Sequence, residues 1–411
     1  MTEKTKYWIW MQNALGDAAH LLGVHDPEFV YETIKSGGRL KGFSTSQHAH
    51  LREETLEPAE DIIERCISYG VKIVTPDDEL YPERLLEVPT FPAALYCRGD
   101  EALLKAPLPI ALIGSREPLV TSVTAASALA GLLSNCGFTV VSGGARGVDH
   151  ASHTGALNAG AGTIAVLGTA INDHTYLRQC ESLREVIAAN GLLVSEYPPD
   201  TVMARGSFPK RNRIIAGMTV GTVVIEAGKK SGSLGTAAYA AEFGRDVFAL
   251  SAKGSSMRFA GAEDLLADGA ISAVSAYDVI CEYINVYGAT INFDNVSKED
   301  LVKDLTQDFS TSIPTFDNIL LLDSREKLSK ARHIFHTEKK PVTDPLSGNA
   351  RKVYAVLDAT PRTVEDIYNL CMKRDLGLKF SELTAALCEL EVFEYLDMQP
   401  DRKYKFKQDG N

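Results

Sequence analysis

The sequence lacks the cysteine patterns of metal-binding and disulfide-linked proteins. Its seven cysteines are an odd number, and no Cys-x-x-Cys pair occurs, which argues against a zinc ribbon and against a framework of disulfides. Most of them stand among apolar residues, where cysteine behaves as a small core residue. We therefore expect reduced thiols and a cytoplasmic location.

Long apolar runs and the common nucleotide-binding signatures are missing as well. No segment reaches the roughly 18 apolar residues of a membrane span. The N-terminal stretch MTEKTKYWIWMQ contains an apolar run of only five residues, so it does not resemble a signal peptide. There is no GxGxxG with an acidic residue after the next strand, and no GxxxxGK[ST]. These absences disfavour a membrane protein, a dinucleotide-dependent enzyme and a P-loop ATPase, and we expect no cofactor.

Basic residues are fewer than acidic residues in this chain. The sequence has 42 Lys and Arg residues against 54 Asp and Glu residues, which gives a formal net charge of −12 and a pI near 5.3. That balance argues against broad nonspecific attraction to nucleic acid or to anionic membranes. It leaves room for a local basic site, because binding responds to the field in one groove.

With 411 residues, of which 45% are hydrophobic, the chain is long enough for two or three domains with sizeable cores. Apolar residues at helical spacing predict a helical domain over 1–70, of the SAM or helix–hairpin–helix kind. We assign 71–285 to an α/β domain and 286–345 to a linker with one helix near LSKARHIFH. Three predicted helices and a β-hairpin make 346–411 a winged-helix-like domain.

The central domain alternates short apolar runs with longer Ala- and Leu-rich segments. Nearly continuous apolar strands indicate a parallel sheet buried on both faces by helices. We therefore predict an extended Rossmann-type, doubly wound α/β fold. The expected strands are 109–114, 139–143, 163–168, 192–197, 222–227 and 246–250.

Glycines and cations follow several of these strands. Ligands of open parallel sheets bind at the carboxyl ends of the strands, where glycine lets phosphate oxygens approach backbone N–H groups and a helix N-terminus adds positive potential. The relevant stretches are GSR (114–116), GGARGVD (143–149), the loop that leads to Arg205, and AGKKSGSLGT (227–236). Any one of them could be an ordinary tight turn, but the set favours a ligand that carries phosphate.

One window of the acidic chain contains no carboxylate. The charged residues between Asp200 and Glu226 are all basic, and most of them lie in FPKRNR. Such a window suits the binding of a polyanion. Phe208 offers a flat face on which a base could stack, but it could equally be a core residue beside Pro209. Arg213 could instead form a structural ion pair with Glu196 or Glu226.

Asp149, His150 and His153 invite a metal or acid–base interpretation. Asp149 stands where a helix N-cap belongs and His153 lies one turn further on. No second cluster supplies partner ligands. We therefore predict neither a metal site nor a catalytic residue.

Several of these motifs, in order over about 105–250, make the chain similar to the DNA-processing protein A family, also called Smf. They are GSR, SGGARGVD, TIAVLGT, LLVSEYPP, FPKRNRIIAG and EAGKKSGSLGTA. The resemblance implies a protein without enzymatic activity that binds single-stranded DNA, forms a homodimer and helps load a RecA-type recombinase during natural transformation and recombination. The candidate DNA-binding residues are Arg116, Ser142, Gly143, Arg205, Phe208, Lys210, Arg211, Asn212, Arg213, Ser231 and Gly232.

The chain departs from the family pattern in places that leave the dimer open. Leu177 stands where proline is usual, and Glu263 stands where asparagine is usual.

In the C-terminal domain the third predicted helix carries Glu382, Glu389 and Glu391, a charge that phosphate would repel. We predict that this domain binds protein or its own chain rather than duplex DNA, although the wing is basic.

A nucleotide-hydrolysing protein of the lonely-guy type is the main alternative. Its motif PGGxGTxxE aligns with SGSLGTAAY, which places Tyr239 where the catalytic glutamate belongs. Without that carboxylate, cleavage of the N-glycosidic bond lacks its acid–base group. A second alternative is a module that senses a small nucleotide.

Overall fold

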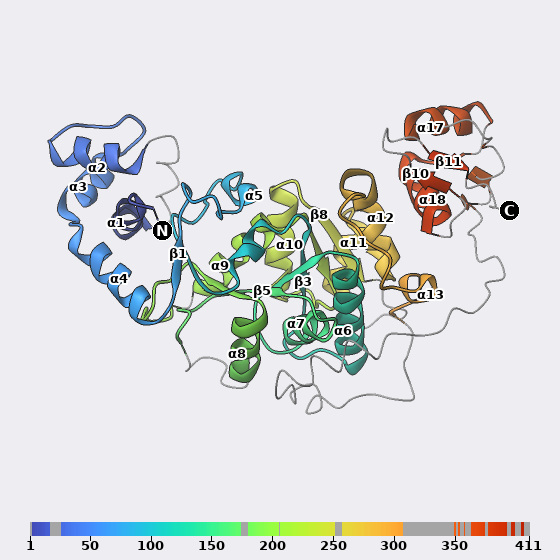
Figure 1. The fold of residues 1–411 in the computed structure, drawn as a ribbon, viewed down its shortest axis with the longest axis horizontal. Helices are drawn as coiled ribbons and strands as arrows, with labels where there is room; N and C mark the ends of the chain where they lie inside the picture. The colour runs from blue at the N-terminus through green and yellow to red at the C-terminus, as the bar shows by residue number, and fades with distance from the viewer. Residues whose placement is uncertain are drawn as a thin grey trace.

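The structure is a computed structural model of the chain (Figure 1). It describes residues 2–16, 26–173, 180–204, 206–250, 257–306, 349–350, 352–353, 357, 363–374, 377–392, 396–398 and 404–406. The helix expected near LSKARHIFH, as well as Arg205 and Leu177, lie outside these ranges.

A nine-stranded sheet forms the centre of the molecule, in the order β1-β2-β6-β5-β4-β3-β7-β8-β9. The pairs from β6 through β9 are parallel, whereas β2 runs antiparallel to β6 and β1 antiparallel to β2. The strands are β1 (Lys72–Val74), β2 (Leu95–Gly99), β3 (Pro109–Ile113), β4 (Thr139–Ser142), β5 (Thr163–Leu167), β6 (Leu192–Ser195), β7 (Gly221–Val224), β8 (Asp246–Leu250) and β9 (Ile271–Ala273).

The six strands expected from the sequence are all present, which confirms the doubly wound α/β fold. The sheet is larger than expected, because the proline-punctuated stretch before β3 adds the antiparallel edge and Ile271–Ala273 adds a parallel edge strand. Strands β1 and β9, with three residues each, are too short to show a pattern of their own.

Helices cover both faces of the sheet (Figure 1). Neighbouring residues of one strand bury against opposite layers: Ile110 contacts the layer that contains α6, and Ala111 contacts the layer that contains α9. The first layer consists of α6 (Val120–Asn135), α7 (Val148–Asn158), α8 (Glu181–Asn190) and α12 (Ala276–Tyr287). The second consists of α5 (Glu83–Leu86), α9 (Ser207–Met218), α10 (Ser233–Glu242) and α11 (Ala260–Ala267).

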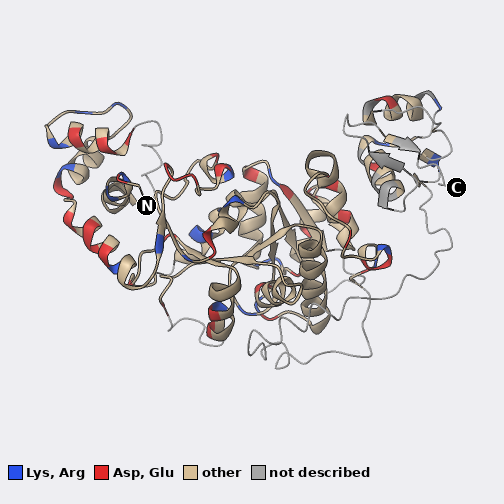
Figure 2. Ribbon diagram, viewed as in Figure 1, with Lys and Arg blue, Asp and Glu red and all other residues tan. Residues whose placement is uncertain are grey.

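Four N-terminal helices pack at the β1–β2 end of the sheet, around the buried Trp10. They are α1 (Thr5–Leu15), α2 (Pro27–Lys35), α3 (Thr45–Glu53) and α4 (Glu57–Ser68), and a 3-10 helix, η2 (Glu101–Lys105), follows β2. Figure 2 marks acidic residues along α2 and α4, whereas α6 next to the sheet has none. The negative charge of the protein is therefore prominent at its N-terminal end.

Packing on the central domain continues past the boundary at residue 285 that the sequence suggested. Helix α13 (Lys298–Leu301) follows α12, and Ile291, Leu301 and Leu305 are buried in the same core as α6. The segment up to residue 306 therefore belongs structurally to the α/β unit.

The C-terminal elements are α17 (Val364–Lys373), α18 (Phe380–Val392) and an antiparallel pair of strands, β10 (Leu396–Met398) and β11 (Tyr404–Phe406). They contact α12 of the central unit: the hydroxyl of Tyr277 donates to the carbonyl of Ala385 at 2.7 Å. The C-terminal elements thus contact their own chain, and the preference of this domain for protein or its own chain over duplex DNA stays a prediction.

Within the described part of the chain, no helix is both long and apolar enough to cross a membrane.

Candidate nucleic-acid interface

The chain order of the strands creates a crevice beside β3. Strands β4, β5 and β6 extend the sheet on one side of β3, and the chain then returns to place β7 on the other side. At such a switch point the loops after two neighbouring strands diverge and leave room for a ligand. Here the loops that follow β3 and β7, together with α9, enclose a cavity of about 990 Å³.

Three of the glycine-bearing or basic stretches noted in the sequence meet at this cavity. They are Gly114–Arg116 after β3, the first turn of α9, and the loop that leads from β7 into α10. The loop after β4 contributes less, through Ala145 and the helical residue Asp149. The polar and charged lining residues are Ser115, Arg116, Asp149, Arg211, Asn212, Lys230, Ser231, Ser233, Thr236, Tyr239 and Glu242.

Phe208 lies at the wall of the cavity and is half-buried. On one side it packs so closely on Gly168 that a β-carbon there would lie 2.6 Å from its Cδ1 atom. The guanidinium carbon of Arg116 lies over the ring, 5.5 Å from its centroid, within the range of a cation–π interaction. Phe208 therefore packs on its own chain and also faces the cavity, and the stacking of a base on it stays a prediction.

Arg211 forms part of the floor of the cavity and is only 5% exposed. Its Nη1 donates to the carbonyl oxygen of Gly143 at 2.7 Å and to that of Val166. A β-carbon at position 143 would lie 2.7 Å from the Nη2 atom of Arg211, so glycine is required for this approach. The side chain joins α9 to the loop after β4 and to strand β5, and it keeps its charge under the cavity.

Asp149 is buried beside this arginine, and the N–H of Ala145 donates to its Oδ2 atom at 3.3 Å. Burial raises the pKa of the Asp149 carboxyl, and the charge of Arg211 acts in the opposite direction. The expected N-cap role is wrong: Gly147 is the N-cap of α7, and Asp149 is the second residue of the helix.

Arg213 is turned away from the cavity into the protein. It is 4% exposed and forms an ion pair with the buried carboxylate of Glu196, just after β6. The alternative of a structural ion pair is thereby confirmed. Lys210 contacts the same carboxylate at 3.3 Å, and its Nζ lies 5.6 Å from the centroid of the Tyr197 ring. The window without carboxylates is therefore partly neutralised by a residue from outside it.

The remaining candidates divide into buried and cavity-lining residues. Ser142 is fully buried and donates to the carbonyl of Leu112 at 2.6 Å, so its hydroxyl is occupied within the sheet. Asn212 donates to the carbonyl of Gly232 at 3.3 Å and so connects α9 to the loop before α10. Ser231 lies 2.7 Å from Ser233, hydroxyl to hydroxyl, and both line the cavity.

Lys230 is exposed and lines the cavity, although the set of candidates omitted it. Its position two residues after a glycine, in the loop that enters α10, was a signal that could have identified it. Arg116 and Lys230 thus present two exposed cations on the loops that flank the crevice.

His150 and His153 are buried residues of α7. The Nδ1 atom of His153 lies 2.8 Å from the hydroxyl of Thr163 on β5. Within the described ranges, no group of three or more His, Cys, Asp or Glu side chains could hold a metal ion. Burial lowers the pKa of His150 to about 4 and that of His153 to about 3.

Because burial lowers the pKa of both histidines, we predict that the protein loses stability in mild acid. Both stay neutral in the folded chain at pH 5, whereas the unfolded chain protonates them below about pH 6.5. With respect to these two groups, the free energy of unfolding is highest above pH 6.5. It falls as the pH drops from 6.5 towards 4 for His150 and towards 3 for His153. Urea unfolding at pH 7 and pH 5 should show a loss of about 2 kcal/mol per histidine, partly offset by the raised pKa of Asp149.

The variant His153→Asn isolates one of these contributions. Its free energy of unfolding should change less between pH 7 and pH 5 than that of the wild type, by about 2 kcal/mol. An equal change in both proteins would show that His153 is not held neutral by burial.

The fold and the cavity together define a doubly wound α/β protein with a ligand crevice at its switch point. The family model for DNA recombination-mediator protein A matches residues 72–284, which is the part of the chain that builds the sheet and the cavity. The chain belongs to this family, and the resemblance seen in its motifs is confirmed.

Individual relatives agree with that assignment. Protein Smf of Synechocystis sp. is 32% identical over 343 residues, which cover 81% of this chain and 80% of that protein. DNA processing protein DprA of Streptococcus pneumoniae is 34% identical over 269 residues, 66% of this chain and 86% of that protein. The crystal structure of that DprA has a TM-score of 0.59 and 29% identity, and the match covers 68% of this chain and 99% of that one.

Proposed function

We propose that this protein binds single-stranded DNA in the crevice between the loops after β3 and β7, without chemical conversion of the DNA. The observation that carries this proposal is the combination, around one cavity of about 990 Å³, of two exposed cations, a buried arginine and an aromatic ring. Cationic grooves with an aromatic side chain bind single strands because phosphates meet charge and unstacked bases meet a ring.

Each lining group has a role in this proposal. Arg116 and Lys230 contact phosphates from the two sides of the crevice. The N-terminal turn of α10, which begins at Ser233, adds backbone N–H groups and hydroxyls for the same phosphates. Arg211 supplies positive potential from the floor while its hydrogen bonds hold α9 in place. Arg205, which the resemblance also suggests, is a further phosphate contact in this proposal.

A base takes the place of the Arg116 side chain on Phe208. In the structure the guanidinium lies over the ring, so a base can stack there only after the arginine moves to a phosphate. On binding, Arg116 exchanges its contact with the Phe208 ring for one with a phosphate, and the ring exchanges its contact with Arg116 for one with a base. This exchange accounts for an arginine beside an aromatic residue at the entrance of the cavity.

Substitutions of Phe208 test this role. Phe208→Ala should weaken the binding of oligo(dT) by about 1–3 kcal/mol, which is the usual effect of losing one stacked base. Phe208→Leu keeps the apolar packing on Gly168 and should lose nearly as much, whereas Phe208→Tyr should bind like the wild type. If Phe208→Leu binds with wild-type affinity in fluorescence anisotropy titrations, the ring has only a packing role.

We further propose that the protein acts in the cytoplasm as a homodimer that helps load a RecA-type recombinase, in natural transformation or another form of recombination. The family assignment supports a role in recombination. The contact of α18 with α12 supports a C-terminal domain that binds protein, including its own chain.

The test of the DNA-binding proposal is a titration with oligo(dT) of increasing length at several salt concentrations, beside a duplex of the same length. We expect the affinity to rise with strand length, to fall with salt and to exceed that for the duplex. A preference for the duplex would contradict the proposal.

Nucleotide chemistry remains the second candidate because of one observation. Glu242 lines the cavity one helical turn beyond Tyr239, so the crevice contains a carboxylate close to the position that hydrolysis requires. Incubation with nucleoside monophosphates separates the two functions: free base is expected only from a hydrolase. Tight binding of a mononucleotide, independent of strand length, would instead indicate a nucleotide sensor.

A further inference from the structure

The loop between β6 and α9 approaches the cavity from the side of the N-terminal helices. It starts at Glu196, whose backbone carbonyl accepts a hydrogen bond from Gln12 of α1 at 3.2 Å. It ends in the first turn of α9, where Phe208 faces the cavity. Apolar burial orders only part of it: Pro199 is buried, whereas Val202 is 89% exposed and Met203 is 41% exposed. Polar contacts add to this fixation around residue 200.

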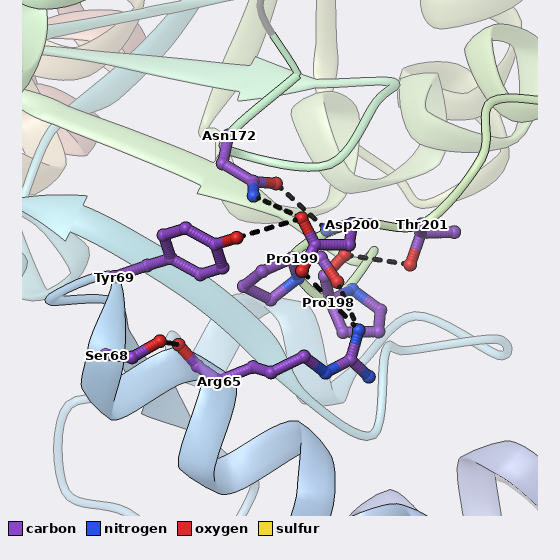
Figure 3. Close-up of polar contacts among 8 residues, drawn as sticks. All are labelled: Arg65, Ser68, Tyr69, Asn172, Pro198, Pro199, Asp200 and Thr201. Carbon is purple, nitrogen blue, oxygen red and sulfur yellow. Dashed lines mark hydrogen bonds and ion pairs between the residues drawn. The ribbon is translucent and has the colours of Figure 1, made fainter.

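Asp200 is the centre of these polar contacts (Figure 3). Its Oδ1 atom accepts from the hydroxyl of Tyr69, at the end of α4, at 3.2 Å and from Nδ2 of Asn172, after β5, at 2.8 Å. Its own N–H donates to Oδ1 of Asn172 at 3.0 Å. Its second carboxylate oxygen lies 3.7 Å from Nη1 of Arg65 on α4. One side chain thus joins three segments that are far apart in the sequence.

The backbone at Asp200 supports the same interpretation. Its φ of +67° is the only positive value among the described residues other than glycine. Aspartate and asparagine tolerate this left-handed conformation better than other side chains. The conformation turns the carboxylate towards α4 and the loop after β5 at once, as Figure 3 shows.

The residues on either side transmit this fixation along the loop. The carbonyl of Pro199 accepts from Nη1 of Arg65 at 3.0 Å, and that of Pro198 accepts from the hydroxyl of Thr201 at 2.8 Å. Nearer to α9, the N–H of Ser207 donates to the carbonyl of Ala204 at 3.1 Å. The loop is thus tied to the N-terminal helices at one end and to the first turn of α9 at the other.

We propose that Asp200 is a positioning residue through which the N-terminal helices increase the affinity for single-stranded DNA without touching it. This inference rests on the proposed function of the cavity. Asp200 fixes the loop, and the fixed loop holds the first turn of α9, with Phe208, in the position that DNA needs. Because the loop is ordered before the DNA binds, the entropic cost of ordering it does not reduce the affinity.

The test compares two substitutions of the same residue. Asp200→Gly keeps the left-handed backbone without strain and removes every side-chain contact. Asp200→Asn also tolerates this backbone and retains an oxygen that can accept from Tyr69 and Asn172. Asn172→Ala removes the hydrogen bonds between positions 172 and 200 from the other segment and leaves the contacts of Asp200 with Tyr69 and Arg65. Ser68→Ala is the matched control, because its hydroxyl donates only within α4, to the carbonyl of Arg65 at 2.8 Å.

We expect Asp200→Gly and Asn172→Ala to weaken oligo(dT) binding about five- to tenfold, with the melting temperature nearly unchanged. The amides of 197–204 should exchange hydrogen faster in both variants. Asp200→Asn and Ser68→Ala should bind within about twofold of the wild type.

The inference is overturned if Asp200→Gly binds like the wild type while Arg116→Ala binds weakly. It is also overturned if Asp200→Gly weakens binding without faster exchange in 197–204, since the effect would not then pass through the loop. Failure of the proposed function itself looks different, because the wild type would not bind single-stranded DNA at all.

Discussion

Replacement of Arg116 by alanine is expected to weaken the binding of oligo(dT) by about 10- to 100-fold. The guanidinium is exposed at the entrance of the cavity and lies over Phe208, so its loss removes a charge-assisted hydrogen bond of about 1.5–3 kcal/mol to a phosphate. One fewer phosphate contact should also reduce the slope of log K against log salt by about 0.7. Anisotropy titrations at several salt concentrations measure both quantities.

Two further variants control this prediction. Arg98→Ala removes an arginine on β2 that pairs with Glu185 at 2.7 Å and does not line the cavity, so it should leave DNA binding unchanged. Arg116→Lys should recover part of the affinity, since it keeps the charge without the forked geometry. Equal losses from Arg98→Ala and Arg116→Ala would show that only the overall charge matters.

The second large effect is on stability. Glu196→Ala should lower the free energy of unfolding by about 3–5 kcal/mol, because it leaves the guanidinium of Arg213 buried without its carboxylate. Both side chains are only 5% exposed, so water cannot replace the lost partner. Lys210, 27% exposed, can turn to solvent and adds little to the loss. Chemical denaturation of the variant beside the wild type measures the difference.

A double variant distinguishes the loss of the whole ion pair from the cost of leaving one buried charge without its partner. Glu196→Leu with Arg213→Met replaces two buried charges by apolar groups and should be much more stable than either single variant. Arg213→Met should also leave the salt dependence of DNA binding unchanged. A reduced salt slope for Arg213→Met, at retained stability, would contradict the structural role of Arg213 and restore it as a phosphate contact.

The central fold could be predicted because its information is local. Apolar runs such as those of β3 and β5 are buried on both faces, and each is followed by a glycine. The edge strands β1 and β9 have three residues each, and only pairing with the rest of the sheet makes them strands. No periodicity along the chain reveals such short partners.

The site was predictable in its location but not in the direction of its side chains. The glycine-bearing loops after β3 and β7 do meet at the cavity, because the carboxyl ends of parallel strands share one edge. The stretch FPKRNR, by contrast, is helical, so its cations point to different sides of α9. Arg211 reaches backbone carbonyls and Arg213 reaches Glu196. Residues close in sequence were thereby assigned to one surface that they do not share.

The neutralisation of that stretch was hidden for the same reason. Glu196 stands 14 positions before Lys210 and 17 before Arg213 in the chain, outside the window that contains no carboxylate. Only the return of the chain from β6 through the loop to α9 brings the three together. Charge counted along a sequence therefore describes a surface only when the path of the chain is known.

Hydrogen exchange with and without oligo(dT) tests most directly whether the crevice beside β3 holds DNA. We predict slower exchange on binding in peptides that cover the first turn of α9 and the loop from β7 into α10, with little change in α17 and α18. Protection confined to α17, α18 and the β10–β11 pair, with the crevice unaffected, would contradict the account.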